Sequence, residues 1–278
     1  MDISDRFLRN IKTGLGSALV CDSGFDITVA SEIMSILALS KSYSDLRKKL
    51  ARIYLADTVA KQPVTAKDIK VYGAMAVLLK EAIKPNLVQT QECTPCFVHT
   101  GPFGNIAHGS SSILADEIAL SLSDFVVTES GFGADLGAEK FFDIKCRYSG
   151  LAPDCAVIVV SLRALNMHGL ENLRKQIENV LIFGVPVVVA INKFNTDTTK
   201  EINLVKARAG DFGASDCVVS EVWQRGSAGG LDLAKAVIKA AKQKNKFKFL
   251  YSLDTPIKEK IGAIATKIYG AKDVKYSE

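Results

Sequence analysis

The clearest hydrophobic pattern of the chain lies between residues 156 and 191. Residues 156–161 and 185–191 are dense in Val and Ile and do not alternate with polar positions. This pattern is typical of strands that are buried on both faces, as in a parallel sheet. Between these runs, residues 170–183 carry apolar positions at helical spacing, and Gly184 follows, which predicts a helix that ends there. The apolar stripe of this helix consists of Leu170, Leu173, Ile177, Val180 and Leu181.

Weaker patterns of the same two kinds alternate along the rest of the chain. Apolar runs that predict strands lie at 96–99, 125–128 and 217–220. Helical spacing is found at 28–40, 43–53, 72–83, 112–122, 139–147, 198–208, 230–242 and 256–269. The alternation predicts an α/β fold with a mostly parallel sheet flanked by helices. Ligands of such sheets bind beyond the carboxyl ends of the strands, so the loops after residues 101, 131, 192 and 223 are expected to share one edge.

The composition is typical of a soluble, globular protein. The chain has 278 residues, of which 48% are hydrophobic and 23% are charged. It has neither a membrane-length apolar stretch nor a signal peptide, so we expect a cytoplasmic protein without a membrane partner. The net charge of +5 is too small to indicate nucleic acid. The Lys-rich residues 242–248 suggest a boundary, and we expect an α/β core over 1–240 and a C-terminal helical segment over 241–278.

A glycine-rich loop follows the predicted strand 125–128, and a helix follows the loop. Glycines in such a strand-to-helix turn allow backbone N–H groups to approach an anion at the positive end of the helix. The same glycines also serve tight turns that bind nothing, and this alternative stays open. A dinucleotide site would need an acidic residue after the next strand, but Ser161, Leu162 and Arg163 stand there.

A second polar loop, residues 101–110, follows the predicted strand 96–99. His108 in this loop could contact a phosphate or transfer a proton. The alternative is that Asn105 and His108 only satisfy the backbone groups of the loop.

Polar and aromatic residues also follow the strands that end near residues 191 and 220. The sequence Asn192-Lys193 is similar to the base-reading loop of GTPases, but Asn195 stands where guanine requires an aspartate. Trp223 is the only tryptophan of the chain. A strand-end aromatic can stack on a flat ring, and packing in the core is the alternative.

The six cysteines are scattered and are expected to be free thiols. Cys93 and Cys96 with His99 have a spacing found in metal sites, but a second ligand pair is missing from the neighbouring sequence. We therefore expect no metal site.

An ordered series of segments, spread over essentially the whole chain, resembles the formate–tetrahydrofolate ligase family. The segments are 24–32 (GFDITVASE), 63–68 (PVTAKD), 84–90 (KPNLVQT), 101–109 (GPFGNIAHG) and 126–142 (VVTESGFGADLGAEKFF). Cys93, Cys96, Gly104 and Ser111 depart from the usual residues of the family.

The resemblance implies a fold like that of P-loop NTPases and the ATP-dependent formylation of tetrahydrofolate through formyl phosphate. The substrates would be ATP with magnesium, formate and tetrahydrofolate, without a tightly bound cofactor. The loop implied for formyl phosphate contains Gly131, Phe132, Gly133 and Ala134. The implied nucleotide or folate pocket contains Asn192, Lys193, Phe194 and Trp223, the two aromatic residues enclosing a flat ring. The candidates for catalysis are His108, Gly131 and Gly133.

The resemblance also implies a phosphate-binding Gly-Lys-Thr segment upstream of this region, and the chain contains no Gly-Lys dipeptide. Two hypotheses stay open. The chain is a ligase, or the larger piece of one whose phosphate loop lies on a complementary polypeptide. Alternatively, it is an inactive remnant that keeps a folate or nucleotide pocket or a homo-oligomer interface.

Overall fold

The computed structural model describes residues 8–24, 31–101 and 108–277. The chain divides into two compact units, Met1–Ser130 and Gly131–Glu278. The division at residue 240 that we expected from the sequence stays a prediction. None of the described helices is both long and apolar enough to cross a bilayer.

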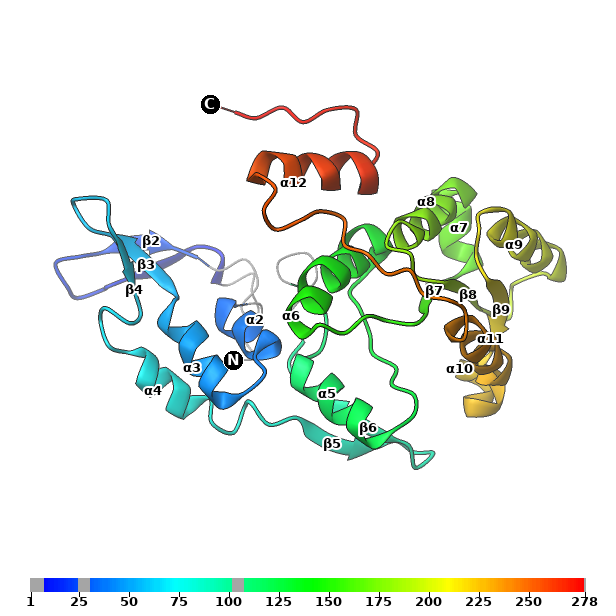
Figure 1. Ribbon diagram of the computed structural model, residues 1–278, viewed down its shortest axis with the longest axis horizontal. Helices are drawn as coiled ribbons and strands as arrows, with labels where there is room; N and C mark the ends of the chain where they lie inside the picture. The colour runs from blue at the N-terminus through cyan, green and yellow to red at the C-terminus, as the bar shows by residue number, and fades with distance from the viewer. Residues whose placement is uncertain (1–7, 25–30, 102–107, 278) are drawn as a thin grey trace. The chain divides into compact units, whose positions relative to one another are not determined.

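The second unit contains a parallel sheet with the strand order β7–β8–β9 (Figure 1). Its strands are β7 (Ala156–Val160), β8 (Val187–Asn192) and β9 (Asp216–Ser220). All residues of β8 are buried except the partly buried Asn192. The sheet confirms that both Val- and Ile-rich runs are strands, and β8 is buried on both faces as predicted. For β7 the predicted burial was wrong, since Val157 is 40% exposed and Val159 is 68% exposed.

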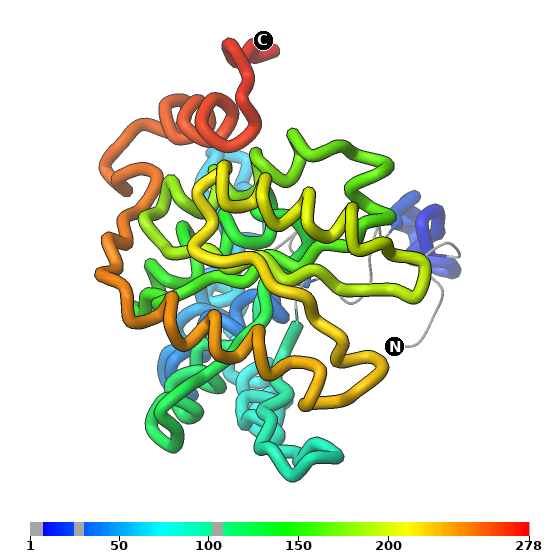
Figure 2. The backbone as a smooth tube through the Cα atoms, turned by 90° about the vertical axis from the view of Figure 1, so that its right-hand side faces the viewer, coloured from blue at the N-terminus to red at the C-terminus, as the bar shows by residue number. Residues whose placement is uncertain are grey.

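Helices cover both faces of this sheet. On one face, α8 (Leu170–Leu181) and α9 (Thr199–Asp211) pack in one cluster with Val189. On the other face, α11 (Leu231–Ala241) packs against Val188, and Figure 2 shows α9 and α11 on opposite sides of the strands. Because neighbouring residues of a strand point to opposite faces, every position of β8 meets a helix. This double cover explains why its apolar run is unbroken.

Short helical segments complete the second unit. A helical stretch with wide, π-type turns runs over Gly133–Ala138 and Phe141–Cys146 and continues in α6 (Arg147–Ser149). It includes the helix that we predicted at 139–147. The remaining segments are α7 (Leu162–His168), α10 (Val222–Arg225), Gly226–Gly230, α12 (Ile257–Ala263) and Ile264–Ile268.

The described part of the first unit contains helices and antiparallel hairpins. The helices are α2 (Glu32–Leu39), α3 (Tyr43–Ala51), α4 (Tyr72–Leu78) and α5 (Ile113–Leu122). The side chains of Ser31, Ser42 and Ser112 accept a backbone N–H at the start of α2, α3 and α5, which stabilises each helix start. The core of the unit contains Leu37, Leu46, Leu50, Ile53 and Ala76.

The strands of the first unit pair only as antiparallel hairpins within its described part, so the parallel sheet is confined to the second unit. The hairpins are β1 (Ile11–Thr13) with β2 (Cys21–Ser23), β3 (Tyr54–Asp57) with β4 (Pro63–Thr65), and β5 (Asn86–Gln89) with β6 (Pro95–Val98).

The prediction of a strand at 125–128 was wrong. Phe125 is 61% exposed and Val127 is 92% exposed. The segment has no ladder with any described strand, and only the neighbouring Ser130 forms a single bridge, to Ser110. The apolar run therefore lies in an extended connection, because a strand requires a partner as well as apolar residues.

Candidate functional site

The carboxyl ends of β8 and β9 bring two of the predicted segments together. The two strands are parallel and in register, with Asn192 opposite Ser220. Beyond them, the N–H of Lys193 donates to the carbonyl of Ser220 over 3.1 Å. The segment that contains Asn192, Lys193 and Phe194 and the segment that leads to Trp223 therefore lie at one edge of the sheet.

An ion pair, with a second cation on the same carboxylate, links these two segments. The Nζ of Lys193 lies 2.7 Å from Oε1 of Glu221, and Nη1 of Arg225 lies 3.2 Å from Oε2 of the same carboxylate. The hydrogen bond from Lys193, then that from Arg225, holds the pKa of Glu221 below its ordinary value. A carboxylate that stays ionised holds Lys193 in place over the working range of pH. The apolar pattern of the sequence gave no sign of this role for Glu221.

A second link lies beside the first, between the loop after β8 and α10. Nε2 of Gln224 donates to Oδ1 of Asn195, and the N–H of Phe194 donates to Oδ2 of Asp197 over 2.9 Å. The aromatic ring of Phe194 is half exposed, and Trp223 is 89% exposed. Trp223 is thus not a core residue. The stacking of a flat ring between the two aromatic residues stays a prediction.

The glycine-rich loop of the second unit is fixed by close backbone packing. Gly133 has a φ of 74°, which favours glycine. A Cβ atom at Gly137 would lie 1.9 Å from the carbonyl oxygen of Gly131, so a larger residue there would displace the loop. Phe132 between them is almost fully exposed. The glycines therefore serve a tight turn, whether or not the loop also binds an anion.

Gln176 on α8 pins this loop to the rest of the second unit. Its Oε1 accepts the N–H of Ala134 over 2.5 Å, and its Nε2 donates to Oδ1 of Asp135 over 3.1 Å. The N–H of Ala134 is therefore already engaged and does not face an anion. The helical stretch that begins at Gly133 still directs its positive end to the loop. The role of Gly131, Phe132, Gly133 and Ala134 in binding formyl phosphate stays a prediction.

Behind the loop, two buried carboxyl groups lie four residues apart. Burial, the charge of Asp143 and a hydrogen bond with it raise the pKa of Glu139 to about 7. Burial also raises the pKa of Asp143, against the hydrogen bond from the N–H of Leu250 and the charge of Arg147. Nη2 of Arg147 lies 3.0 Å from Oδ1 of Asp143. Glu139 therefore exchanges its proton near neutral pH, which the sequence did not predict.

The loop with His108 is described only in part. Residues 102–107, with Asn105, lie outside the described residues. His108 is buried and belongs to the first unit. Its predicted role in catalysis stays a prediction.

The Cys-x-x-Cys segment does not form a metal site with His99. Cys93 is exposed in a turn with a φ of 65°. The two ring nitrogens of His99 are engaged within the protein, by Oγ of Ser112 at 2.6 Å and the carbonyl of Ala82 at 2.8 Å. Among the residues that the structure describes, no three His, Cys, Asp or Glu side chains gather in a metal-binding group. His99 is therefore a structural residue of the first unit.

The second unit thus defines the chain as an α/β protein of the class whose ligands bind beyond parallel strands. A sequence model of the family described as "Formate--tetrahydrofolate ligase" matches residues 1–278. The chain belongs to the formate–tetrahydrofolate ligase family, which confirms the resemblance seen in the sequence.

A curated mouse protein gives a measure of this relationship. The chain is 50% identical over 309 residues to the protein named "Monofunctional C1-tetrahydrofolate synthase, mitochondrial" of Mus musculus. The alignment covers 100% of this chain and 32% of the mouse protein. The chain thus spans about a third of the length of the curated relative that it matches.

Proposed function

We propose that this chain takes part in the ATP-dependent formylation of tetrahydrofolate to 10-formyltetrahydrofolate. The family and the name of the mouse relative support a ligase of this kind. The observation that carries the proposal is the edge of the sheet where Lys193, Phe194 and Trp223 lie on two linked segments. This edge presents the ammonium group of Lys193 and two accessible aromatic faces, which suit a flat, anionic substrate.

The reaction would proceed in two transfers. An oxygen of formate attacks the γ-phosphorus of ATP, the bond to ADP breaks, and formyl phosphate forms. The N10 amine of tetrahydrofolate then attacks the formyl carbon, loses its proton, and inorganic phosphate leaves. Both steps build negative charge on oxygens, so the protein must supply cations and N–H donors. ATP is expected as its magnesium complex, because proteins bind Mg²⁺ largely through substrate phosphates.

All proposed roles except that of His108 fall on two parts of the second unit. Phe194 and Trp223 would enclose the adenine or the pterin ring, and Asn192 and Lys193 would contact the polar edge of that ring. The glycine loop with Gly131, Phe132, Gly133 and Ala134 would lie against formyl phosphate, with Gly131 and Gly133 allowing close approach. His108 is the proposed proton-transfer or phosphate-contact residue of the loop 101–110.

A second candidate is a binding piece of a split ligase, or a remnant without activity. The observation behind it is that the 278 residues align with 32% of the mouse relative. A complementary polypeptide would then supply the phosphate loop. We also propose that the protein forms a homo-oligomer and that it is cytoplasmic. The name of the mouse relative states a mitochondrial protein.

The single tryptophan allows a direct test of the pocket. Tetrahydrofolate and ATP are titrated separately, with Trp223 fluorescence and calorimetry as readouts. The ligand whose ring stacks should quench the fluorescence, and Trp223→Ala should bind it about tenfold more weakly, since a stacked pair contributes about 0.5–1.5 kcal/mol beyond burial. Trp223→Phe, which keeps an aromatic face, should recover most of the affinity.

The formation of 10-formyltetrahydrofolate from ATP, formate and tetrahydrofolate separates the two candidates. Turnover in the usual range of roughly 1–1000 per second indicates a complete ligase. Ligand binding without turnover indicates the binding piece. Calorimetric binding that leaves the fluorescence unchanged, and that Trp223→Ala does not weaken, would refute the pocket.

A further inference from the structure

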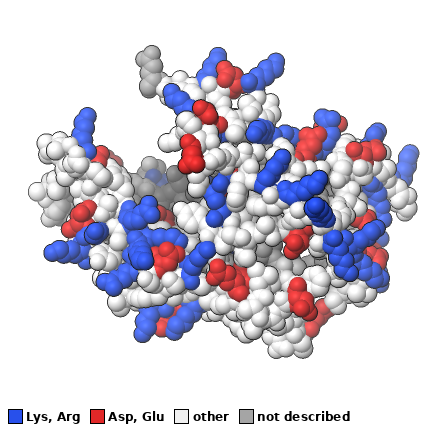
Figure 3. All heavy atoms as spheres, in the orientation of Figure 1, with Lys and Arg blue, Asp and Glu red and all other residues white. Residues whose placement is uncertain are grey.

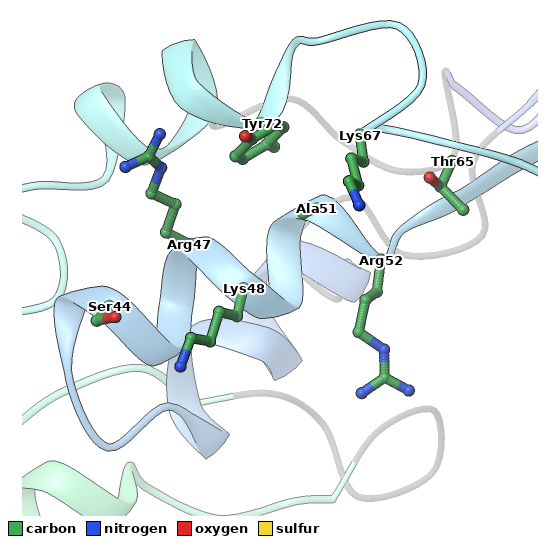
Figure 4. A pocket seen from close by; sticks show the side chains of 8 residues that line it. All are labelled: Ser44, Arg47, Lys48, Ala51, Arg52, Thr65, Lys67 and Tyr72. Carbon is green, nitrogen blue, oxygen red and sulfur yellow. The ribbon is translucent and has the colours of Figure 1, made fainter.

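A basic hollow lies in the first unit and is lined by none of the residues assigned above. Its cavity volume is about 610 Å³, within the range of small-molecule sites. Its walls come from α3, the segment after β4 and the start of α4 (Figure 4). Four cations line it: Arg47, Lys48, Arg52 and Lys67.

Helical spacing places three of these cations on one side of α3. Leu46 and Leu50 are buried in the core of the unit. Arg47 and Lys48, together with Arg52 just after the helix, occupy positions that solvent reaches. All three therefore lie outside the buried stripe of the helix and line the hollow.

The backbone holds the fourth cation against the end of α3. The N–H of Lys67 donates to the carbonyl of Ala51 over 3.1 Å, and the N–H of Ala66 donates to the carbonyl of Ile53 over 2.9 Å. Arg47 is also oriented, since its guanidinium lies 5.4 Å from the centre of the Tyr72 ring. The hollow is therefore formed by fixed segments of the first unit.

Among the residues that the structure describes, no carboxylate lines the hollow, and none of the four cations forms an ion pair. The neighbouring carboxylates have other partners. Asp45 lies 2.8 Å from Nζ of Lys49, and Asp68 accepts the hydroxyl and the N–H of Thr65 at 2.7 Å. Burial opposes the change, but the hydrogen bond from Lys49 and, to a smaller extent, the charge of Lys48 lower the pKa of Asp45. The two hydrogen bonds from Thr65 and, to a smaller extent, the charge of Lys67 lower the pKa of Asp68. Figure 3 shows Lys and Arg side chains gathered over the part of the unit around α3.

We propose that this hollow binds a small molecule that carries two or more phosphate groups. The four cations are spread around the hollow instead of converging on one point (Figure 4), which favours an extended anion over a single phosphate. Arg47 and Arg52 can each hold a phosphate with paired N–H donors, and Lys48 and Lys67 add point charges. The hydroxyl of Ser44 supplies a further polar contact. A nucleoside polyphosphate and linear polyphosphate share this chemistry.

Calorimetry with inorganic tripolyphosphate tests the site. The variant Lys48→Glu with Lys67→Glu reverses two of the four charges. The control, Lys200→Glu with Lys239→Glu, makes the same change of charge on exposed positions of α9 and α11. The first variant should bind at least tenfold more weakly, and the control should stay within about twofold of the unchanged protein. Binding should also weaken between 50 and 300 mM salt, since the Debye length is about 10 Å at 0.1 M.

Three outcomes would overturn the proposal: no saturable binding at low salt, equal losses in both variants, or equal affinities in all three proteins. Lys67→Gln, an exposed single change, replaces the double variant if that variant does not fold, and should weaken binding severalfold. Competition with ATP distinguishes the two kinds of ligand. Displacement of tripolyphosphate by ATP from the control, but not from the double variant, indicates that the site binds a nucleotide. Lack of displacement indicates that it binds linear polyphosphate. A constant Trp223 signal during the tripolyphosphate titration separates this hollow from the proposed ligase pocket.

Discussion

The buried carboxyl pair makes the stability of the protein depend on pH in a predictable direction. In the folded chain the pKa of Glu139 is raised from 4.5 to about 7. The folded state therefore binds this proton more tightly than the unfolded state does. The stabilising contribution is fully present below pH 4.5, decreases as the pH rises, and is lost above about pH 7.

The size of the effect follows from the same values. One pKa unit corresponds to about 1.4 kcal/mol. The raised pKa would thus give somewhat more than 3 kcal/mol, which we reduce to about 2 kcal/mol because water partly screens the group. The variant Glu139→Gln resembles the protonated side chain, since its amide can still donate to Asp143. It should match the unchanged protein near pH 5 and exceed its free energy of unfolding by about 2 kcal/mol near pH 8.

Urea unfolding at half-unit steps between pH 5 and pH 8.5 measures this difference. The control Glu32→Gln removes one carboxylate at an exposed helix start in the first unit. The expected result is a gap between Glu139→Gln and the unchanged protein that widens with pH. A gap that stays constant, or that narrows as the pH rises, would refute the raised pKa.

Three further predictions concern the core, a turn and a helix start, all measured by urea unfolding. Ile177→Ala should cost about 2–5 kcal/mol because the side chain is fully buried, whereas Ile177→Val should cost about 1 kcal/mol. Gly184→Ala should destabilise the protein far more than Gly210→Ala, since the first Cβ would lie 2.2 Å from the Lys246 carbonyl and the second meets open space. Thr198→Ala should cost about 1 kcal/mol through its lost capping box, and Thr198→Ser should restore most of it. Equal effects within any of these pairs would contradict the corresponding reasoning.

Two elements with a strong, uninterrupted pattern were predictable from the sequence, whereas the run 156–161 predicted the strand β7 but not its exposed residues Val157 and Val159. The run 185–191 indicated a strand buried on both faces, and β8 is the central strand with helices on both sides. The stripe with Leu173 and Ile177 indicated a helix that ends before Gly184, and α8 has that form. In both cases the local spacing of apolar residues predicts the type of element, and the tertiary contacts agree with that prediction.

Elements that depend on a partner were not predictable in the same way. The run 125–128 has the composition of a strand, but it has no ladder with a described strand, and Val127 is almost fully exposed. Conversely, β1 and β2 are three residues each and carry no clear alternation, yet they form a hairpin. Strand pairing is decided by neighbours that a local window does not contain.

The candidate site shows the same division between local and long-range information. The strand-end rule predicted the edge with Lys193 and Trp223, because parallel strands in register must bring their following residues together. The rule does not predict Glu221, whose carboxylate ties the two segments through Lys193, or Gln176, which lies 42 positions from Ala134.

These long-range contacts matter for the proposed chemistry because they limit the motion of the binding segments. A lysine held by Glu221 and a glycine loop held by Gln176 keep their positions before a ligand arrives, so less conformational entropy is lost on binding. The cost is that Lys193 and the N–H of Ala134 already have partners, and a substrate must share or displace them. A ligand with several anionic oxygens can share Lys193, whose ammonium has three donors. The N–H of Ala134 has one donor only. Under the proposed function, formyl phosphate would therefore lie against residues 131–133 and the helix end, with Gln176 as the fixed support of the loop.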